Sequence, residues 1–123
     1  MRGCHITRIE SRVGLGIPDC LIAFKEGVFV MLELKVVKRG RKVNLSPHQI
    51  AFHLKHATDM GCPTFVLVQH IPPSGMTRES MLLLYKGSQV MELKKLGVDL
   101  QPEGEWSWRA PMWEMMRDQL LTA

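Results

Sequence analysis

VFVMLELKVV, residues 28–37, is an apolar run that only Glu33 and Lys35 interrupt. Its length and its Val and Leu content predict a buried β-strand. Successive side chains of a strand point to opposite faces, so Glu33 and Lys35 share one face, opposite to Val30 and Leu32. The fold prediction starts from this strand, because it brings two charged side chains to one place inside a sheet.

A second apolar run, residues 20–24, comes just before this strand, and Lys25-Glu26-Gly27 lies between the two. Two such runs separated by three residues that include a glycine predict a β-hairpin. Asp19 opens the first run, so the hairpin brings it toward Glu33. Buried sheets seldom contain carboxylates unless these are paired or bound to a cation.

The remaining elements follow from apolar periodicity and from turn residues. Ser46-Pro47 is a helix start, with Ser46 as N-cap, and Gly61 ends that helix after Met60. We expect strands over 5–10, 63–69 and 81–85, helices over 88–96 and 111–121, loops over 11–18, 38–43 and 71–79, and an irregular segment over 99–110. The order βββαββαα predicts an α/β fold, a central mixed β-sheet flanked by helices. The 123 residues fit one domain, 1–123.

Charge is distributed unevenly along the chain. Residues 1–61 contain ten Lys and Arg against five Asp and Glu, a balance of +5, whereas residues 62–123 contain six against seven, a balance of −1. A basic half is typical of proteins that bind a polyanion such as nucleic acid, although a solvated surface gives the same balance. No signal peptide and no run of membrane-spanning length occurs, so we expect a soluble protein of the cytoplasm, the host cytoplasm if the chain is of phage origin.

Two carboxylates and one ammonium that meet in a sheet have a chemical use. Asp19 and Glu33, with the carbonyl of Leu34, offer oxygen ligands, which suit Mg²⁺ or Mn²⁺ better than zinc. Such a cation offsets charge that develops on a phosphodiester, and Lys35 can orient a water molecule or stabilise that charge. A structural network of salt bridges among the same three residues is the alternative.

Three motifs in order resemble those of a known group: Gly16-Ile17-Pro18-Asp19, Glu33-Leu34-Lys35 and Ser46-Pro47-His48-Gln49. Over about residues 5–70, the chain resembles the VRR-NUC branch of the PD-(D/E)XK nuclease superfamily. The resemblance implies a restriction-endonuclease-like core and Mg²⁺-dependent hydrolysis of DNA to 5′-phosphate and 3′-hydroxyl ends. It also implies a homodimer that cuts branched DNA such as Holliday junctions, as stand-alone phage and bacterial members do, in DNA recombination and repair.

The resemblance assigns roles residue by residue. Asp19 and Glu33 match the metal carboxylates, Lys35 matches the active-site lysine, and Gln49 matches a glutamine that orders the site or touches DNA. Glu10 is the one acidic residue before Asp19 and is a candidate second metal ligand, or a partner of Arg8 or Arg12 in a salt bridge.

We expect a cationic rim to bring DNA to this acidic centre. Its candidate members are Arg8, Arg12, Lys38, Arg39, Arg41, Lys42 and Ser46. A flexible solubilising loop would explain residues 38–42 equally well. Other functions consistent with the sequence are a nickase, a flap or general DNA nuclease, and a non-catalytic DNA-binding module.

Overall fold

A computed structural model describes residues 3–9, 16–72, 80–108 and 112–122. The strands are β1 (Cys4–Arg8), β2 (Cys20–Phe24), β3 (Val28–Val37), β4 (Thr64–His70), β5 (Met81–Lys86) and β6 (Gly104–Ser107). The helices are α1 (Pro47–His53), its π-helical continuation η1 (Leu54–Asp59), α2 (Val90–Leu96) and α3 (Met112–Thr122), with 3₁₀ turns η2 (Gly87–Gln89) and η3 (Gly97–Asp99) beside α2.

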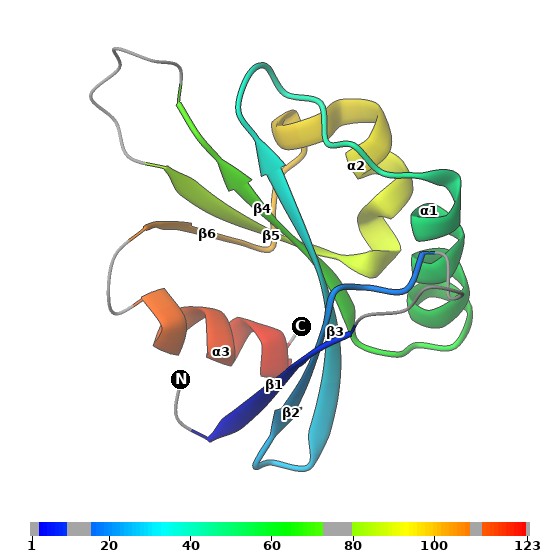
Figure 1. The fold of residues 1–123 in the computed structure, drawn as a ribbon, viewed down its shortest axis with the longest axis vertical. Helices are drawn as coiled ribbons and strands as arrows, with labels where there is room; N and C mark the ends of the chain where they lie inside the picture. The colour runs from blue at the N-terminus through cyan, green and yellow to red at the C-terminus, as the bar shows by residue number, and fades with distance from the viewer. Residues whose placement is uncertain (1–2, 10–15, 73–79, 109–111, 123) are drawn as a thin grey trace.

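The six strands form one sheet in which spatial order follows chain order, β1 to β6. All neighbours are antiparallel except β3 and β4, which run parallel and are connected through α1 and η1. A parallel pair needs a crossover, and here the crossover carries the basic loop and α1 from the end of β3 back to the start of β4. The mixed α/β sheet that the sequence predicts is confirmed (Figure 1).

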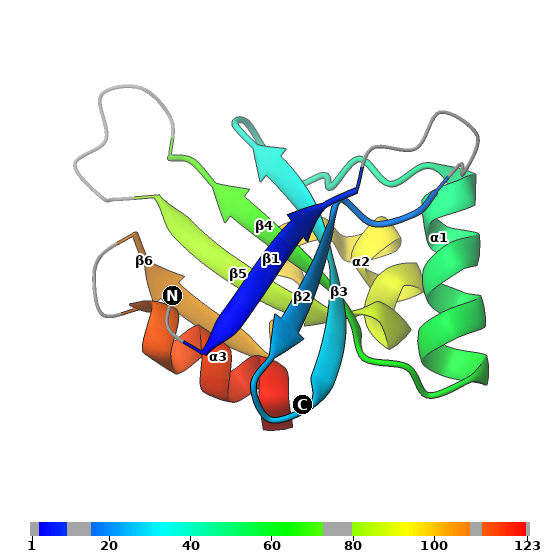
Figure 2. The same ribbon diagram turned by 60° about the horizontal axis from the view of Figure 1, so that its bottom comes forward.

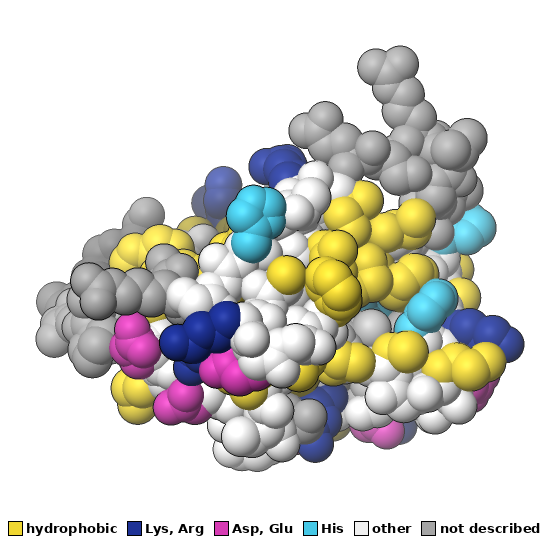
Figure 3. All heavy atoms as spheres, turned by 90° about the horizontal axis from the view of Figure 1, so that it is seen from below, with side chains coloured by type: hydrophobic (Ala, Val, Ile, Leu, Met, Phe, Trp, Pro, Cys, Tyr) yellow, Lys and Arg dark blue, Asp and Glu magenta, His cyan; other side chains and the backbone are white. Residues whose placement is uncertain are grey.

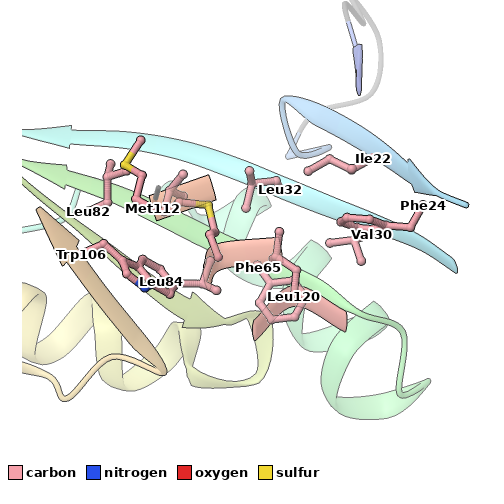
Figure 4. Close-up of a cluster of buried hydrophobic side chains, with 12 residues drawn as sticks. Ile22, Phe24, Val30, Leu32, Phe65, Leu82, Leu84, Trp106, Met112 and Leu120 are labelled. Atoms are coloured by element: carbon pink, nitrogen blue, oxygen red, sulfur yellow. The ribbon is translucent and has the colours of Figure 1, made fainter. Parts of the chain in front are cut away.

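Helices cover both faces of the sheet, as Figures 1 and 2 show, with α1 and α2 on one face and α3 on the other. The side chains of β3 divide as expected: Val30 and Leu32 enter the core under α3, whereas Val37 enters the core under α1 and α2. Figure 4 shows the core under α3, where Phe65 and Leu84 of the central strands meet Met112 and Leu120.

The prediction of an irregular segment over 99–110 is wrong for β6. Its residues pair with β5, and Trp106, opposite Leu82, is buried. Gly104 lacks the Cβ that would lie 2.2 Å from the Trp106 ring, so the ring can cover the backbone of its own strand. The strand escaped prediction because its four residues, Gly-Glu-Trp-Ser, show no apolar alternation.

Part of the sheet face that carries α1 is open to solvent. Seen from the side of the β2–β3 hairpin, hydrophobic side chains gather between the hairpin and the segment of α1 and η1 (Figure 3). A groove there is lined by Leu21, Phe29, Met31 and Cys62 among others, and Phe29 is 64% exposed. Cys62 is exposed, although its apolar sequence neighbours favour burial. No helix in the described part of the chain is both long and apolar enough to cross a membrane.

Candidate active site

Asp19 and Glu33 meet at the point where β2 begins. The hairpin register pairs Cys20 with Leu32, so Asp19, one residue earlier, lies opposite Glu33 and on the same face. The two carboxyl groups lie close enough for Asp19 to raise the pKa of Glu33. The second carboxylate oxygen of Asp19, Oδ2, accepts a hydrogen bond from the backbone N–H of Leu34 at 2.8 Å. The hairpin therefore holds two acidic side chains in contact beside the backbone of β3.

Glu33 is 2% exposed, and its Oε1 atom has no hydrogen-bond partner among the residues that the structure describes. Burial, followed by the hydrogen bond and the negative charge of Asp19, raises the pKa of Glu33 to about 8, while the charge of Lys35 lowers it. At neutral pH the pair therefore holds a proton on Glu33. A cation beside the two carboxyl groups would favour loss of this proton.

Lys35 is held by the start of α1. Its Nζ donates to Gln49 Oε1 at 2.9 Å, and the same oxygen accepts from the backbone N–H of Ser46 at 3.0 Å. Ser46 Oγ in turn accepts from the Gln49 N–H at 3.1 Å, and Pro47 occupies the first turn. This capping box confirms the predicted helix start, and it makes one side-chain oxygen both a helix cap and the anchor of the lysine.

The segment before Asp19 rests directly on α1. Gly16 has φ +83°, and a Cβ there would lie 2.3 Å from the backbone oxygen of His48. Only glycine accommodates both the left-handed conformation and this contact. The close approach fixes the path from Gly16 through the buried Pro18 to Asp19.

The donor set fits a hard divalent cation. Asp19 and Glu33 supply carboxylate oxygens, and the Leu34 carbonyl points to the same strand edge as its N–H, which binds Asp19. In the described ranges no group of three or more His, Cys, Asp or Glu side chains is placed to hold a metal. Mg²⁺ is typically bound by one or two carboxylates with water or phosphate completing its shell, so two suffice. Glu10, the other candidate ligand, lies outside the described residues.

Exposed basic side chains lie near both ends of this site. Arg8 ends β1 opposite Cys20, the neighbour of Asp19. Lys38 and Arg39 follow β3 directly and are exposed, as are Arg41, Lys42 and Ser46 further along the crossover. Arg41 already pairs with Asp99 at 2.9 Å, so its charge is partly compensated. Arg12 lies outside the described residues.

One buried polar residue near the site escaped the sequence analysis. His53 of α1 is fully buried, its Nδ1 lies 2.8 Å from Thr64 Oγ1, and Nε2 has no partner in the described part of the chain. Burial, followed by the charges of His56 and Lys35, lowers the pKa of His53 to about 4, so it is neutral. Apolar residues recur along this helix at Ile50, Leu54 and Ala57, a spacing that places them on one side. His53 follows Ile50 by three residues and falls on the same side, and this spacing was the signal that could have identified it.

Comparisons with models of protein families and with curated proteins find no match to this sequence. Among solved structures, the chain is similar to Hjc, a Holliday junction resolvase from the archaeal hyperthermophile Archaeoglobus fulgidus. The TM-score is 0.46 and the sequence identity 15%, over 68% of this chain and 65% of the resolvase chain. The match thus spans just under two thirds of the resolvase, and the proposal below rests on the site itself.

Proposed function

We propose that the chain is a Mg²⁺-dependent endonuclease that hydrolyses phosphodiester bonds in branched DNA. The observation that carries the proposal is the contact of Asp19 with Glu33 in a buried sheet, with the ammonium of Lys35 held two residues along the same face. Three motifs that resemble those of VRR-NUC nucleases provide these residues in order. A salt-bridge network alone would not explain a buried carboxyl that has one oxygen without a partner among the described residues.

Each residue has a distinct task. Asp19 keeps one oxygen on the backbone of β3 and offers the other toward the site, while Glu33 must release its proton before both carboxylates can bind a cation. When bound, Mg²⁺ supplies positive charge against the phosphate and lowers the pKa of nearby water. Lys35, restrained by Gln49, is placed to orient the attacking water or stabilise charge on the phosphate. Water adds to phosphorus as the 3′-oxygen leaves, giving a 5′-phosphate and a 3′-hydroxyl.

The substrate and the assembly are also part of the proposal. Arg8, Lys38, Arg39 and Lys42 place exposed positive charge near an acidic centre, as a nuclease for a polyanion requires. Symmetric cuts across a four-way junction need two active sites related by a two-fold axis, and one chain supplies one. We therefore propose that the enzyme acts as a homodimer.

The experiment that tests the site is cleavage of a synthetic four-way junction in Mg²⁺ or Mn²⁺. We expect Asp19→Asn and Glu33→Gln each to lower the rate by roughly 10²-fold or more, because each removes a charge that acts at the transition state. Asp59→Asn and Glu92→Gln change exposed carboxylates elsewhere and serve as matched controls. Cleavage that survives both site substitutions would show that the site is elsewhere.

Two comparisons separate the proposal from its competitors. A nickase, a flap nuclease or a general nuclease would cut flaps, nicked substrates or linear duplex as well as it cuts the junction. A non-catalytic DNA-binding module would bind the junction but show neither cleavage nor Mg²⁺ binding in calorimetry. Preferential cutting of the junction supports the proposed substrate.

A further inference from the structure

Exposed hydrophobic side chains gather on the sheet face that carries α3, beside that helix. Five of the ten large hydrophobic residues that are exposed in the described part of the chain surround two adjoining grooves. They form what we call the tryptophan patch: Ile6, Leu34, Val36, Trp108 and Trp113, each between 42% and 55% exposed. Leu34 and Val36 belong to β3 and lie on the face opposite to Glu33 and Lys35.

The tryptophan patch combines exposed indole side chains with two apolar grooves. The grooves, of about 280 and 240 Å³, share Leu34, Leu67 and Trp113 in their linings, and Trp108 and Val36 border the larger one. A surface with protruding indoles beside apolar hollows is suited to self-complementary contact, in which one copy fills the hollows of the other. Tryptophan is also the residue type most enriched at the energetic centre of interfaces.

Charge favours a protein over a nucleic acid as the occupant. Lys35 is the one charged residue among the described residues that line the two grooves. A nucleic acid strand would bring a phosphate for every nucleotide and would need cations along its path. An apolar centre depleted of charge is instead the composition of a protein interface.

The apolar area of the tryptophan patch is consistent with the centre of a dimer interface. Partly exposed residues such as these five present on the order of a few hundred Å² of apolar surface, which marks an interaction site on a small protein. A stable interface buries about 800 Å² on each partner, so the patch would form its apolar centre and polar neighbours its rim.

We propose that a second copy of this chain covers the tryptophan patch, across a two-fold axis that passes near Leu34 and Trp113. Only the purpose of this dimer rests on the proposed function, because the dimer would contain the two active sites that paired cuts need. In this arrangement β3 has the interface on one face and the catalytic residues on the other. The strand that positions Glu33 and Lys35 is then also held by the partner.

The test is the solution mass of the free protein, measured without DNA or metal by light scattering or sedimentation across a dilution series. We expect twice the 14.0 kDa of one chain. We expect Trp108→Glu and Trp113→Glu each to raise the dimer dissociation constant at least roughly 30-fold, the effect typical of a central aromatic residue. Phe29→Glu, which places the same charge on the opposite face of β3, is the matched control and should leave the mass unchanged.

Circular dichroism and the urea midpoint establish that each variant folds, and Trp108→Ser is a milder second variant at the same position. A monomeric wild-type protein, or a dimer that survives both glutamate substitutions, would overturn the proposal. A monomer produced by Phe29→Glu alone would assign the interface to the opposite face. Loss of affinity for a four-way junction in Trp108→Glu with an unchanged mass would assign the patch to nucleic acid. Because mass needs no cleavage, a dimeric protein without nuclease activity would contradict the proposed function and leave the interface standing.

Discussion

Glu33 is buried, touches another carboxyl and leaves one oxygen without a partner in the described structure, and each of these features costs stability when the group is ionised. A pKa of about 8 in the folded state means that the protein keeps a proton that the unfolded chain has already lost at neutral pH. Ionisation of Glu33 therefore lowers the free energy of unfolding, which makes the pH dependence of stability measurable.

We expect the metal-free protein to lose stability as pH rises. Glu33 has a folded pKa above its unfolded value of 4.5, so its stabilising contribution is complete below pH 4.5 and is lost as pH rises toward about 8. His53 changes stability between its folded pKa of about 4 and its unfolded 6.5, so it adds no slope above pH 6.5. Between pH 6.5 and 8, urea unfolding in EDTA should show a fall of about 1–2 kcal/mol.

Glu33→Gln should remove this fall and make the protein more stable than wild type at pH 8. Glu92→Gln, an exposed carboxylate on α2, should keep it. An unchanged slope in Glu33→Gln would assign the pH dependence to another group.

Gln49 has two roles that can be tested separately: its side-chain oxygen caps α1 at the Ser46 N–H, and it accepts a hydrogen bond from Lys35. Gln49→Ala removes the acceptor of both Ser46 N–H and Lys35 Nζ, so we expect a loss of about 1 kcal/mol of stability. We also expect a roughly 10-fold or greater fall in junction cleavage, because Lys35 loses its restraint. Gln49→Glu keeps an oxygen acceptor and should restore most of both properties.

Ala51→Gly is the control, because Ala51 is an exposed residue of α1 and glycine there costs a similar ~1 kcal/mol without touching Lys35. Unfolding in urea and single-turnover cleavage are the two measurements. If Ala51→Gly lowers cleavage as much as Gln49→Ala, helix stability and not the lysine contact governs activity.

Among the elements, α1, β4 and η2 approach one another closely at Gly87. A Cβ at Gly87 would lie 2.0 Å from Thr64 Oγ1 and 2.8 Å from His53 Nδ1. The glycine thus makes space for the buried His53–Thr64 hydrogen bond, which anchors α1 on β4.

We expect Gly87→Ala to destabilise the protein by about 1–3 kcal/mol through overpacking, with Ser88→Ala, an exposed neighbour, nearly neutral. In a Thr64→Ala background the closest clash is gone, so Gly87→Ala should cost at least about 1 kcal/mol less. Urea unfolding of the four proteins of this cycle gives the coupling. Additive costs would show that Thr64 does not set the packing limit.

Elements with a strong local signal could be predicted from the sequence. The alternation in residues 28–37 predicted which side chains of β3 share a face. The three-residue turn predicted the hairpin, and Ser46-Pro47 predicted the start of α1. Together these predicted that Asp19, Glu33 and Lys35 share a face. The features that the sequence did not reveal depend on tertiary contacts. Strand β6 pairs with β5, where Trp106 lies buried opposite Leu82, and the buried His53 needs the space that Gly87 leaves beside it.

On the scale of the whole molecule, the proposed cation would link the site to overall stability. A ligand that binds only the folded chain stabilises it according to its concentration and affinity. In the proposed Mg²⁺ site both carboxylates would have to be ionised, and Glu33 resists ionisation below pH 8.

We therefore expect Mg²⁺ to raise the melting temperature more at pH 8 than at pH 6. The apparent affinity should be roughly 50-fold weaker at pH 6, because the ionised fraction of Glu33 falls from about a half to about a hundredth. Calorimetry in two buffers of different ionisation enthalpy should detect about one proton released per ion at pH 7. Glu33→Gln should abolish that release, and Asp59→Asn should not. Affinity that is independent of pH would show that Glu33 does not bind the ion.

The close approach of Gly16 to His48 has a practical consequence for anyone who wishes to transplant this chemistry. Three segments that lie far apart along the chain, 16–19, 33–35 and 46–49, are in contact. The first meets the second through the Asp19 carboxylate, the second meets the third through the Gln49 amide oxygen, and the first meets the third through backbone at Gly16 and His48. Grafting the acidic pair alone onto another hairpin would leave its geometry to chance. The smallest portable unit is all three segments in their native orientation, with the glycine included.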